Sequence, residues 1–516
     1  MGAEDGATDA GDRARLWWES RLCLALLVFA MAVPLLYPPI PPLVDLFGHM
    51  GRYRVALDLG RSPWLQQYYD YHWVLIGNLG VDVLVRLLAP LMGLEPAVKL
   101  IVLLIPPLTA IGFLWVAKEV HGRIPPTALF ALPFALGFPF LFGFVNFALS
   151  MALAFLAFGL WLRLARAGRI RLRPLMFVPI SIVIFFTHAY GWGTLGLLCF
   201  SAEAVRQHDR GCPWVRSGIN ATISASVMAL PLAIMLVWRS GAPSGTTGEW
   251  FGFDAKLEWL FSALRDRSKV LDLGSVIVAV ILIALPMRRP WLTVSRNLAF
   301  SALVLLLMFL LLPFVIFGSN YADMRLVPYL YAVALLGIRF RDGTDPKLLN
   351  RFAAAGIAFF LVRIGETTAS FAIAGEDQKA KLQAIDVIPE GARVATLVGI
   401  PCHSWAIPRN IHLGAMVIGR RDGFSNDQWV LGGLNLLQVR YAAAGKFAAD
   451  PSQLVHAENC VGGLAPWSLN TALRELPRQA FDYVWLIDPP AYDPRLIAGM
   501  EPVWRGAGTT LFRIRH

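Results

Sequence analysis

One short stretch of the sequence places an acid, a titratable base and a fixed cation at helical spacing. It begins at Pro41-Pro42-Leu43-Val44-Asp45 and continues to His49 and Arg52. Positions i, i+4 and i+7 lie on one face of a helix. A carboxylate there can deprotonate a hydroxyl group, and a guanidinium can hold a phosphate by two hydrogen bonds. The stretch predicts either a reaction centre or a helix that Asp45 merely caps.

Two further stretches carry polar residues beside apolar segments. His188 follows Phe186-Thr187, and Asp323 and Arg325 open an apolar segment. We expect them on the same side as Asp45, which we predict to be catalytic. The predicted substrate-binding residues are His49, Arg52, His188, Asp323 and Arg325. The alternatives are that Asp323 is a helix cap, that Arg325 anchors a helix at the membrane surface and that His188 is structural.

Aromatic and polar residues are also dense from Trp64 to Trp73. This pattern is equally typical of sugar stacking and of an aromatic belt at a membrane surface. No phosphate-binding loop, nucleophile elbow, zinc-protease helix or paired CxxC motif occurs in the sequence. We therefore predict no cofactor; a divalent metal is chemically compatible, but no residue pattern indicates one.

The elements that must position these residues are apolar helices. The chain has 516 residues, of which 56% are hydrophobic and 16% are charged, whereas soluble proteins carry roughly 25% charged residues. Apolar runs such as 22–36 and 297–317 approach the ~20 residues that a helix needs to cross a bilayer. We predict an all-α polytopic membrane protein with a small C-terminal α/β domain.

The formal charge of +11 comes largely from basic residues beside the apolar runs. Such residues mark cytoplasmic loops, so the charge indicates topology rather than a nucleic-acid partner. Counting between these loops predicts about eleven transmembrane helices. They are 22–38, 97–116, 124–142, 143–162, 174–188, 190–205, 218–238, 272–287, 297–317, 324–340 and 349–370. Asp82 and Arg86 make 73–93 too polar to span, so we expect an interfacial helix there.

The same counting divides the chain into three parts. Residues 1–21 form a cytoplasmic segment, 22–372 the transmembrane domain with a large outer loop at 39–96, and 373–516 a soluble extracytoplasmic domain. Short apolar runs at 392–398, 481–487 and 509–514 predict strands in that domain. Cys402 and Cys460 lie there and either pair in an oxidising compartment or remain free thiols.

The chain resembles the GT-C superfamily, multi-pass glycosyltransferases that use polyprenyl-phosphate sugar donors, and especially GT-C-like bacterial membrane proteins. The resemblance is carried by Asp45, His49 and Arg52, by Gly143-Phe144-Val145-Asn146-Phe147, by Phe186-Thr187-His188, by Asp323-Met324-Arg325, and by the tail segments 388–394 and 481–484. It implies inversion at a sugar carbon with a first-loop carboxylate as base, a role that falls to Asp45. Many relatives show paired acids in this loop, whereas here Asp45 stands alone and the next acids are Asp58 and Asp70.

These observations predict a glycosyltransferase in the bacterial inner membrane, with a cytoplasmic N-terminus and a periplasmic C-terminal domain. Its partners would be a polyprenyl-phosphate-linked sugar, membrane lipid, and a glycan, lipid or protein acceptor. The alternatives are a lipid-linked glycan flippase and a non-catalytic scaffold of envelope assembly. Lys99, Arg363 and Glu366 fall near the ends of predicted spans, which argues against an ion-coupled transporter.

Overall fold

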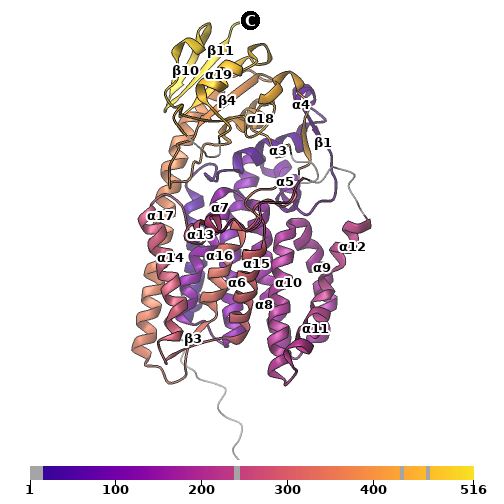
Figure 1. Cartoon of the computed structure of the whole chain (residues 1–516), viewed down its shortest axis with the longest axis vertical. Helices are drawn as coiled ribbons and strands as arrows, with labels where there is room; N and C mark the ends of the chain where they lie inside the picture. Colours follow the sequence, from indigo (N-terminus) through magenta and orange to yellow (C-terminus); the bar gives the residue numbers. More distant parts are fainter. Residues whose placement is uncertain (1–15, 238–244, 431–434, 461–464) are drawn as a thin grey trace, which may run out of the picture.

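The computed structural model describes residues 16–237, 245–430, 435–460 and 465–516. A bundle of long helices forms one end of the molecule and a smaller domain with a β-sheet forms the other (Figure 1). Residues 39–96, which keep the name first outer loop from the prediction, contact the C-terminal domain above the bundle. The molecule is thus organised around the boundary between these two parts.

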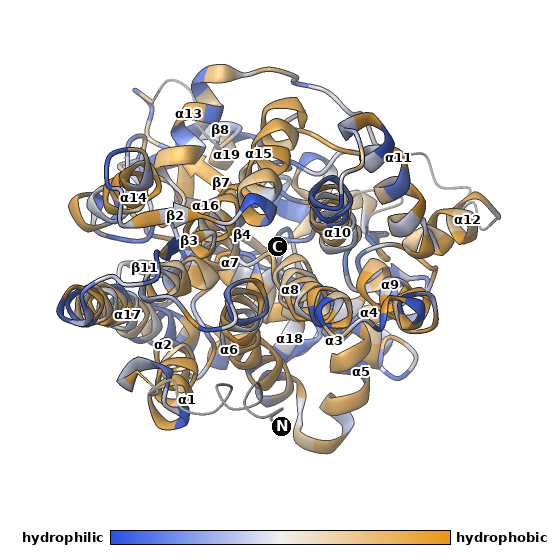
Figure 2. Ribbon diagram, turned by 90° about the horizontal axis from the view of Figure 1, so that it is seen from below, coloured by the Kyte–Doolittle hydropathy of each residue, from blue (hydrophilic) through white to orange (hydrophobic). Residues whose placement is uncertain are grey.

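The bundle is built from the apolar segments of the sequence. Its helices are α1 (Arg21–Ala30), α2 (Val33–Leu36), α6 (Leu94–His121), η2 (Pro126–Leu136), α7 (Phe138–Phe142), α8 (Val145–Arg166), α9 (Arg173–Thr187), α10 (Ala189–Asp209), α11 (Trp214–Ala225), α12 (Leu230–Val237), α14 (Lys269–Ala284), α15 (Arg296–Leu311), α16 (Val327–Leu336) and α17 (Pro346–Leu382). Hydrophobic residues are frequent in the helices around the periphery, as the orange ribbons of Figure 2 show. Leu175 and Val270, for example, are largely exposed, which suits lipid rather than water.

Helix occurs in every predicted span, but the lengths differ from the prediction. Among the described residues, five helices are long and apolar enough to cross a membrane, or six if the bent pair of 214–228 and 230–236 counts as one. The others are shorter, such as α1 and α15. Internal prolines shorten some of the helices, because proline interrupts regular α-helix. Pro133 lies in the 3₁₀-helix η2, and Pro139 is near the start of α7. The structure therefore shows a multi-pass helical architecture without reproducing eleven full-length spans.

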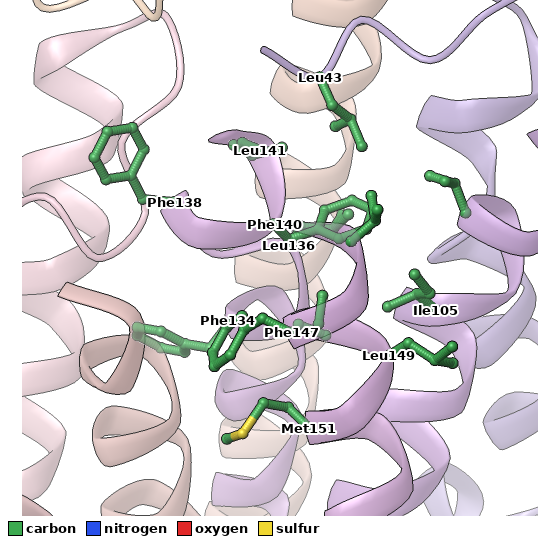
Figure 3. Packing of buried hydrophobic residues seen from close by; sticks show 14 of the residues in the cluster. Leu43, Ile105, Phe134, Leu136, Phe138, Phe140, Leu141, Phe147, Leu149 and Met151 are labelled. Carbon is green, nitrogen blue, oxygen red and sulfur yellow. The ribbon is translucent and has the colours of Figure 1, made fainter. Parts of the chain in front are cut away.

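The packed core reaches up to the start of the first outer loop. Figure 3 shows Leu43 above Phe140 and Leu141, with Phe147 below. All four side chains are almost completely buried. The Asp45 N–H donates to the Phe142 carbonyl at 2.9 Å. These contacts fix the backbone at Asp45 against the turn between α7 and α8.

The first outer loop is folded rather than extended. It contains α3 (Leu46–Asp58), α4 (Pro63–Tyr68), β1 (Tyr69–Tyr71) and α5 (Gly80–Met92). The predicted interfacial helix 73–93 therefore begins only at Gly80. β1 pairs antiparallel with β6 (Leu437–Val439) of the C-terminal domain, and α3 packs on α18 (Met416–Arg421). The loop is thereby attached to both parts of the molecule.

The C-terminal domain contains one main sheet. Its strands are β4 (Arg393–Gly399), β5 (Phe424–Ser425), β7 (Leu454–His456), β8 (Trp467–Ser468), β9 (Tyr483–Ile487), β10 (Met500–Gly506) and β11 (Thr509–Ile514). β4 and β9 are parallel and central, and β11 pairs antiparallel with β9. The three predicted strands correspond to β4, β9 and β11. α17 continues to Leu382 and so crosses the predicted domain boundary at 372/373 as one unbroken helix.

Candidate active site

Asp45 lies at the first turn of α3 without acting as its side-chain cap. Its carboxylate makes no capping hydrogen bond to the helix, and the residue is 8% exposed. Gly143 is packed directly against it, since a Cβ at that glycine would lie 2.7 Å from the Asp45 nitrogen, and its φ is +102°. The local fold thus buries the Asp45 carboxylate without using it to cap α3. The carboxylate is free to interact with other groups, which disagrees with the alternative prediction that Asp45 is only a helix cap.

His412 brings the C-terminal domain to this carboxylate. Its Nε2 lies 3.7 Å from Asp45 Oδ1 and 3.9 Å from Asp450 Oδ1. Its Nδ1 lies 3.1 Å from the carbonyl oxygen of Asp427. Because a carbonyl only accepts hydrogen bonds, Nδ1 carries a proton. Burial lowers the pKa of His412 below its ordinary value, partly opposed by the Asp450 charge, so the neutral ring turns its Nε2 lone pair toward two carboxylates.

Asp450 places a second carboxylate beside His412, on the opposite side of the domain boundary from Asp45. It precedes β7, and Gln453 donates to its Oδ1 at 2.6 Å. Asp58 and Asp70, the nearest acids in the sequence, pair instead with Arg54 at 2.8 Å and Arg440 at 3.2 Å. The paired acids are therefore assembled across the boundary between the outer loop and the C-terminal domain.

The surroundings of Asp45 favour its protonated form. Burial raises the pKa of Asp45 well above its ordinary value, the Asp450 carboxylate raises it further, and the Arg325 guanidinium opposes both. A base whose pKa is closer to neutrality accepts a proton from a substrate more readily than an ordinary aspartate does. Asp45, His412 and Asp450 together can therefore hold and pass one proton.

Arg325 provides the cation of the site. Its guanidinium lies 4.2 Å from the centre of the Phe144 ring, and Nη2 donates to Ser319 Oγ at 3.0 Å and to the Asn320 carbonyl at 3.2 Å. Its Nε is buried and has no partner among the described residues. The charge of Arg325 acts on Asp45, whereas no acidic side chain forms an ion pair with it in the described part of the chain. This leaves a guanidinium with capacity for an anion.

Tyr321 borders the same place. Burial, then the Asp45 and Asp450 charges, raise the pKa of Tyr321 to about 12, so its hydroxyl remains a donor at neutral pH. Its backbone φ is +61°, in the left-handed region that tyrosine rarely adopts. Such conformations concentrate at functional sites.

The remaining predicted residues have identifiable partners. Arg52 forms a buried ion pair with Asp82 at 3.0 Å, and Asn146 donates to the same carboxylate at 3.0 Å. Asp323 pairs with Lys256 at 2.9 Å. Arg52 and Asp323 therefore hold the elements on either side of Asp45 in place.

His188 and His49 adjoin the site through aromatic rings. His188 caps α10, since its Nδ1 accepts the Tyr190 N–H at 3.1 Å, and its ring lies 5.8 Å from Phe147. His49 lies 5.1 Å from Trp429. Burial, and then the Arg52 charge, lower the pKa of His49 well below its usual range. The His49 ring is therefore neutral and borders the site as a polar, uncharged group. In the described part of the chain, no cluster of three or more acidic, histidine or cysteine side chains can hold a metal ion.

The sequence prediction named Asp45 and Arg325 but not His412, Asp450 and Tyr321, which the structure places near them. Asp45 and Asp450 are too far apart in the sequence for the residue spacing within one helix or strand to relate them. The pairing of β1 with β6 and the packing of α3 on α18 bring them together. The one available signal was that His412 and Asp450 lie in a domain expected on the same side as the first loop.

Comparison with known proteins gives a likeness in structure only. No protein-family model matches the chain, and no curated protein matches it. The chain is similar to ArnT from Cupriavidus metallidurans bound to undecaprenyl phosphate (13% identity, TM-score 0.47, covering 95% of this chain and 96% of that one). It is also similar to the apo state of that protein (12%, TM-score 0.46, with the same coverage).

A mycobacterial arabinofuranosyltransferase, AftD, is similar as well. It is 16% identical with a TM-score of 0.44, and the match covers 96% of this chain and 40% of AftD. The ligands and reactions of these proteins are not assigned to this chain by the likeness. The roles assigned below rest on the residues of this chain.

Proposed function

We propose that the chain is a membrane glycosyltransferase of the GT-C type. It transfers a sugar from a polyprenyl-phosphate donor to a hydroxyl group of an extracytoplasmic acceptor. The single observation that carries this proposal is the composite site, in which the buried, uncapped Asp45 meets His412 and Asp450 while Arg325 retains capacity for an anion.

The reaction would proceed in one displacement with inversion. Asp45 takes the proton of the acceptor hydroxyl as its oxygen attacks the anomeric carbon. The bond between that carbon and the donor phosphate oxygen breaks, and the polyprenyl phosphate leaves with the electron pair. Arg325 stabilises the charge that develops on the leaving phosphate. The Tyr321 hydroxyl keeps its proton and is available at the site as a hydrogen-bond donor. His412 and Asp450 position the Asp45 carboxylate and adjust its basicity.

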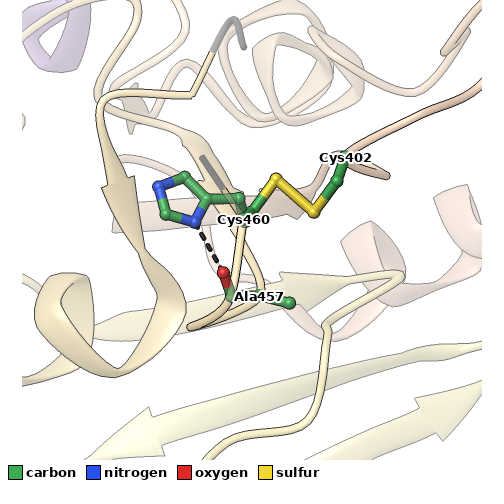
Figure 4. The surroundings of a disulfide bond; sticks show 4 residues. Cys402, Ala457 and Cys460 are labelled. Atoms are coloured by element: carbon green, nitrogen blue, oxygen red, sulfur yellow. Dashed lines mark hydrogen bonds between the residues drawn. A yellow bond between two sulfur atoms is a disulfide. The ribbon is translucent and has the colours of Figure 1, made fainter. Parts of the chain in front are cut away.

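The proposed location is the outer face of the bacterial inner membrane. Cys402 and Cys460 form a disulfide between two loops of the C-terminal domain (Figure 4), while Cys23, Cys199 and Cys212 are free. Disulfides persist in oxidising compartments. The basic segments flanking α11 and β3 (Ile338–Phe340) lie at the end of the bundle opposite the sheet (Figure 1). Both features support a cytoplasmic N-terminus and a periplasmic C-terminal domain.

The direct test uses the purified chain in lipid vesicles with undecaprenyl-phosphate-linked sugars and a set of envelope glycan, lipid and peptide acceptors. We expect acceptor-dependent release of undecaprenyl phosphate, with one phosphate released for each sugar transferred. Movement of the intact donor between leaflets without bond cleavage would instead support a flippase. Neither transfer nor movement would support a scaffold.

The pH dependence of transfer follows from the pKa shift of Asp45. A base must be deprotonated, so kcat/KM falls as the pH drops through the pKa of Asp45. Because that pKa is raised, the loss occurs at a higher pH than for an ordinary aspartate. Asp450→Asn removes a carboxylate that raises the pKa and is expected to move the acid limb to lower pH.

Asp58→Asn is the matched control for this profile, since Asp58 pairs with Arg54 on the opposite end of α3. Its acid limb should coincide with that of the wild type. An acid limb that stays in place in Asp450→Asn, or that moves equally in both variants, would contradict the coupling of Asp45 to Asp450.

A further inference from the structure

A separate cavity lies between α4 and the C-terminal sheet. Its volume is about 530 Å³, and Asp45 is not part of its lining. The side chains relevant here are Trp64, Gln67, Tyr68, Glu390, Arg393 and Arg513. They come from the aromatic stretch of the first outer loop, from the loop before β4 and the first residue of β4, and from β11. The cavity is thus another place where the outer loop and the C-terminal domain meet.

Trp64 forms an aromatic wall of this cavity. The indole is packed on the backbone of Gly391, where a Cβ would lie only 2.3 Å from the ring. Gly391 has a φ of +72°, and the Tyr68 hydroxyl donates to its carbonyl at 2.7 Å. The loop is therefore shaped around the indole, yet Trp64 remains 43% exposed. A fixed, open aromatic ring of this kind offers a stacking surface.

Three side chains around the ring make no hydrogen bond to another side chain in the described part of the chain, although the charge of Glu390 acts on Arg54. Among the described residues, Gln67 and Glu390 make no side-chain hydrogen bond or ion pair, and Arg513 contacts only the Tyr483 ring, 5.9 Å away. An amide, a carboxylate and a guanidinium together offer both donors and acceptors. This combination suits vicinal hydroxyl groups.

The charges of the cavity disfavour an anion. Arg393 is neutralised by its ion pair with Asp482, and its Nη1 donates to the Tyr441 hydroxyl at 3.2 Å. The charges of Arg513 and Glu390 have opposite signs. With no net positive charge, the lining is matched to a neutral polyhydroxylated ligand and not to a phosphate.

The position of the cavity relates it to the proposed reaction. α3 runs from the active site toward α4 and contains 13 residues, which corresponds to roughly 20 Å of helix. Figure 1 shows α4 beside the C-terminal domain, away from the helical bundle, and Trp64 itself packs on Gly391 of that domain. A ligand in the cavity would be distant from the reacting carbon but on the same side of the molecule.

We propose that this cavity is a carbohydrate-binding subsite that holds a neutral sugar unit of the acceptor, remote from the hydroxyl that reacts. The proposal rests on the proposed function, since it identifies the acceptor as a glycan. It assigns Trp64 as the stacking surface and Gln67, Glu390 and Arg513 as the hydrogen-bonding groups. Acceptors long enough to reach it would bind more tightly than single sugars.

The test measures binding without transfer. Full-length Asp45→Asn protein in nanodiscs is applied to an array of neutral oligosaccharides of increasing length, with no donor present. The best ligand is then titrated against Trp64→Ala and Glu390→Gln, each made in the same background. We expect Trp64→Ala to weaken binding roughly tenfold, equivalent to about 1.4 kcal/mol, and Glu390→Gln to weaken it severalfold. Glu390 is exposed, so its variant guards against misfolding of the Trp64 variant.

Trp73→Ala is the matched control, because Trp73 belongs to the same loop, is 42% exposed and lies outside the cavity. Its affinity should be unchanged. The subsite is refuted if the array shows no binding, or if Trp64→Ala and Glu390→Gln bind as tightly as their parent. Either result would refute the subsite without bearing on the proposed sugar transfer. Conversely, a failed transfer assay together with Trp64-dependent oligosaccharide binding would refute the proposed reaction but not the subsite.

Discussion

Replacing Asp45 with asparagine is expected to lower the rate of sugar transfer by about 10²–10⁴, the usual effect of losing a general base. The amide has nearly the same shape as the carboxylate, so packing against Gly143 is retained while proton acceptance is lost. Initial rates of undecaprenyl phosphate release, measured with saturating acceptor, report the effect. Thermal unfolding in detergent checks that the variant is folded.

Asp58→Asn is again the appropriate control, because it removes an acid of the same outer loop whose carboxylate faces Arg54 at 2.8 Å. Its transfer rate should remain near that of the wild type. Near-normal turnover by Asp45→Asn would remove Asp45 from the mechanism, and the acid pair would then have to act through Asp450.

Arg325→Gln is expected to reduce kcat by about 10²–10³, comparable to the loss of one charge-stabilising donor in other enzymes. Glutamine keeps a polar amide at this position but cannot balance a phosphate charge. The effect should be larger on kcat than on donor KM, since the leaving phosphate gains charge in the transition state. Arg325→Lys restores the charge without the fork of donors and should recover part of the rate.

Arg267→Gln provides a matched loss of a guanidinium. Arg267 is exposed and lines a second cavity, about 450 Å³ in volume, beside α17 and Arg409. Its variant should retain the wild-type rate. The opposite pattern, with Arg267→Gln impaired and Arg325→Gln unaffected, would move the donor phosphate to that cavity.

The sequence was sufficient to predict some of the elements around the candidate site because their signals are local. Pro41 and Pro42 end one apolar segment, and the spacing that follows predicted the helix that begins at Leu46. Asp45 and Arg52 were predicted to lie on one helix face, but they do not contact the same residues. Asp45 faces His412, whereas Arg52, in the middle of α3, faces Asp82 from α5. The two positions therefore pack against different elements.

Long-range partners account for what local reasoning missed. The cap predicted as the alternative role of Asp323 is present, since its Oδ1 accepts the Met324 N–H at 2.8 Å. Its buried partner Lys256, on α13 (Phe253–Phe261), gave no sequence signal. His412 and Asp450 are similar cases, because they reach Asp45 only through the docking of two domains. Such contacts depend on tertiary packing, which no spacing rule contains.

The fold was predictable where hydrophobicity alone determines the element. Thr509–Ile514 is the predicted final strand, and His188 lies between two helices as expected. Lengths were less predictable, because proline and glycine shorten helices inside apolar runs. The helix expected over 73–93 starts at Gly80 because Gly77 and Asn78 lie in non-helical backbone.

An experimental structure of the full chain with undecaprenyl phosphate tests the central claim most directly. The account predicts that the phosphate lies against the Arg325 guanidinium, within hydrogen-bond distance, with the Asp45 carboxylate on the side that an acceptor hydroxyl must approach. A phosphate bound elsewhere, with Arg325 still held only by Ser319 and Asn320 and with Asp45 closed off from it, would contradict the account.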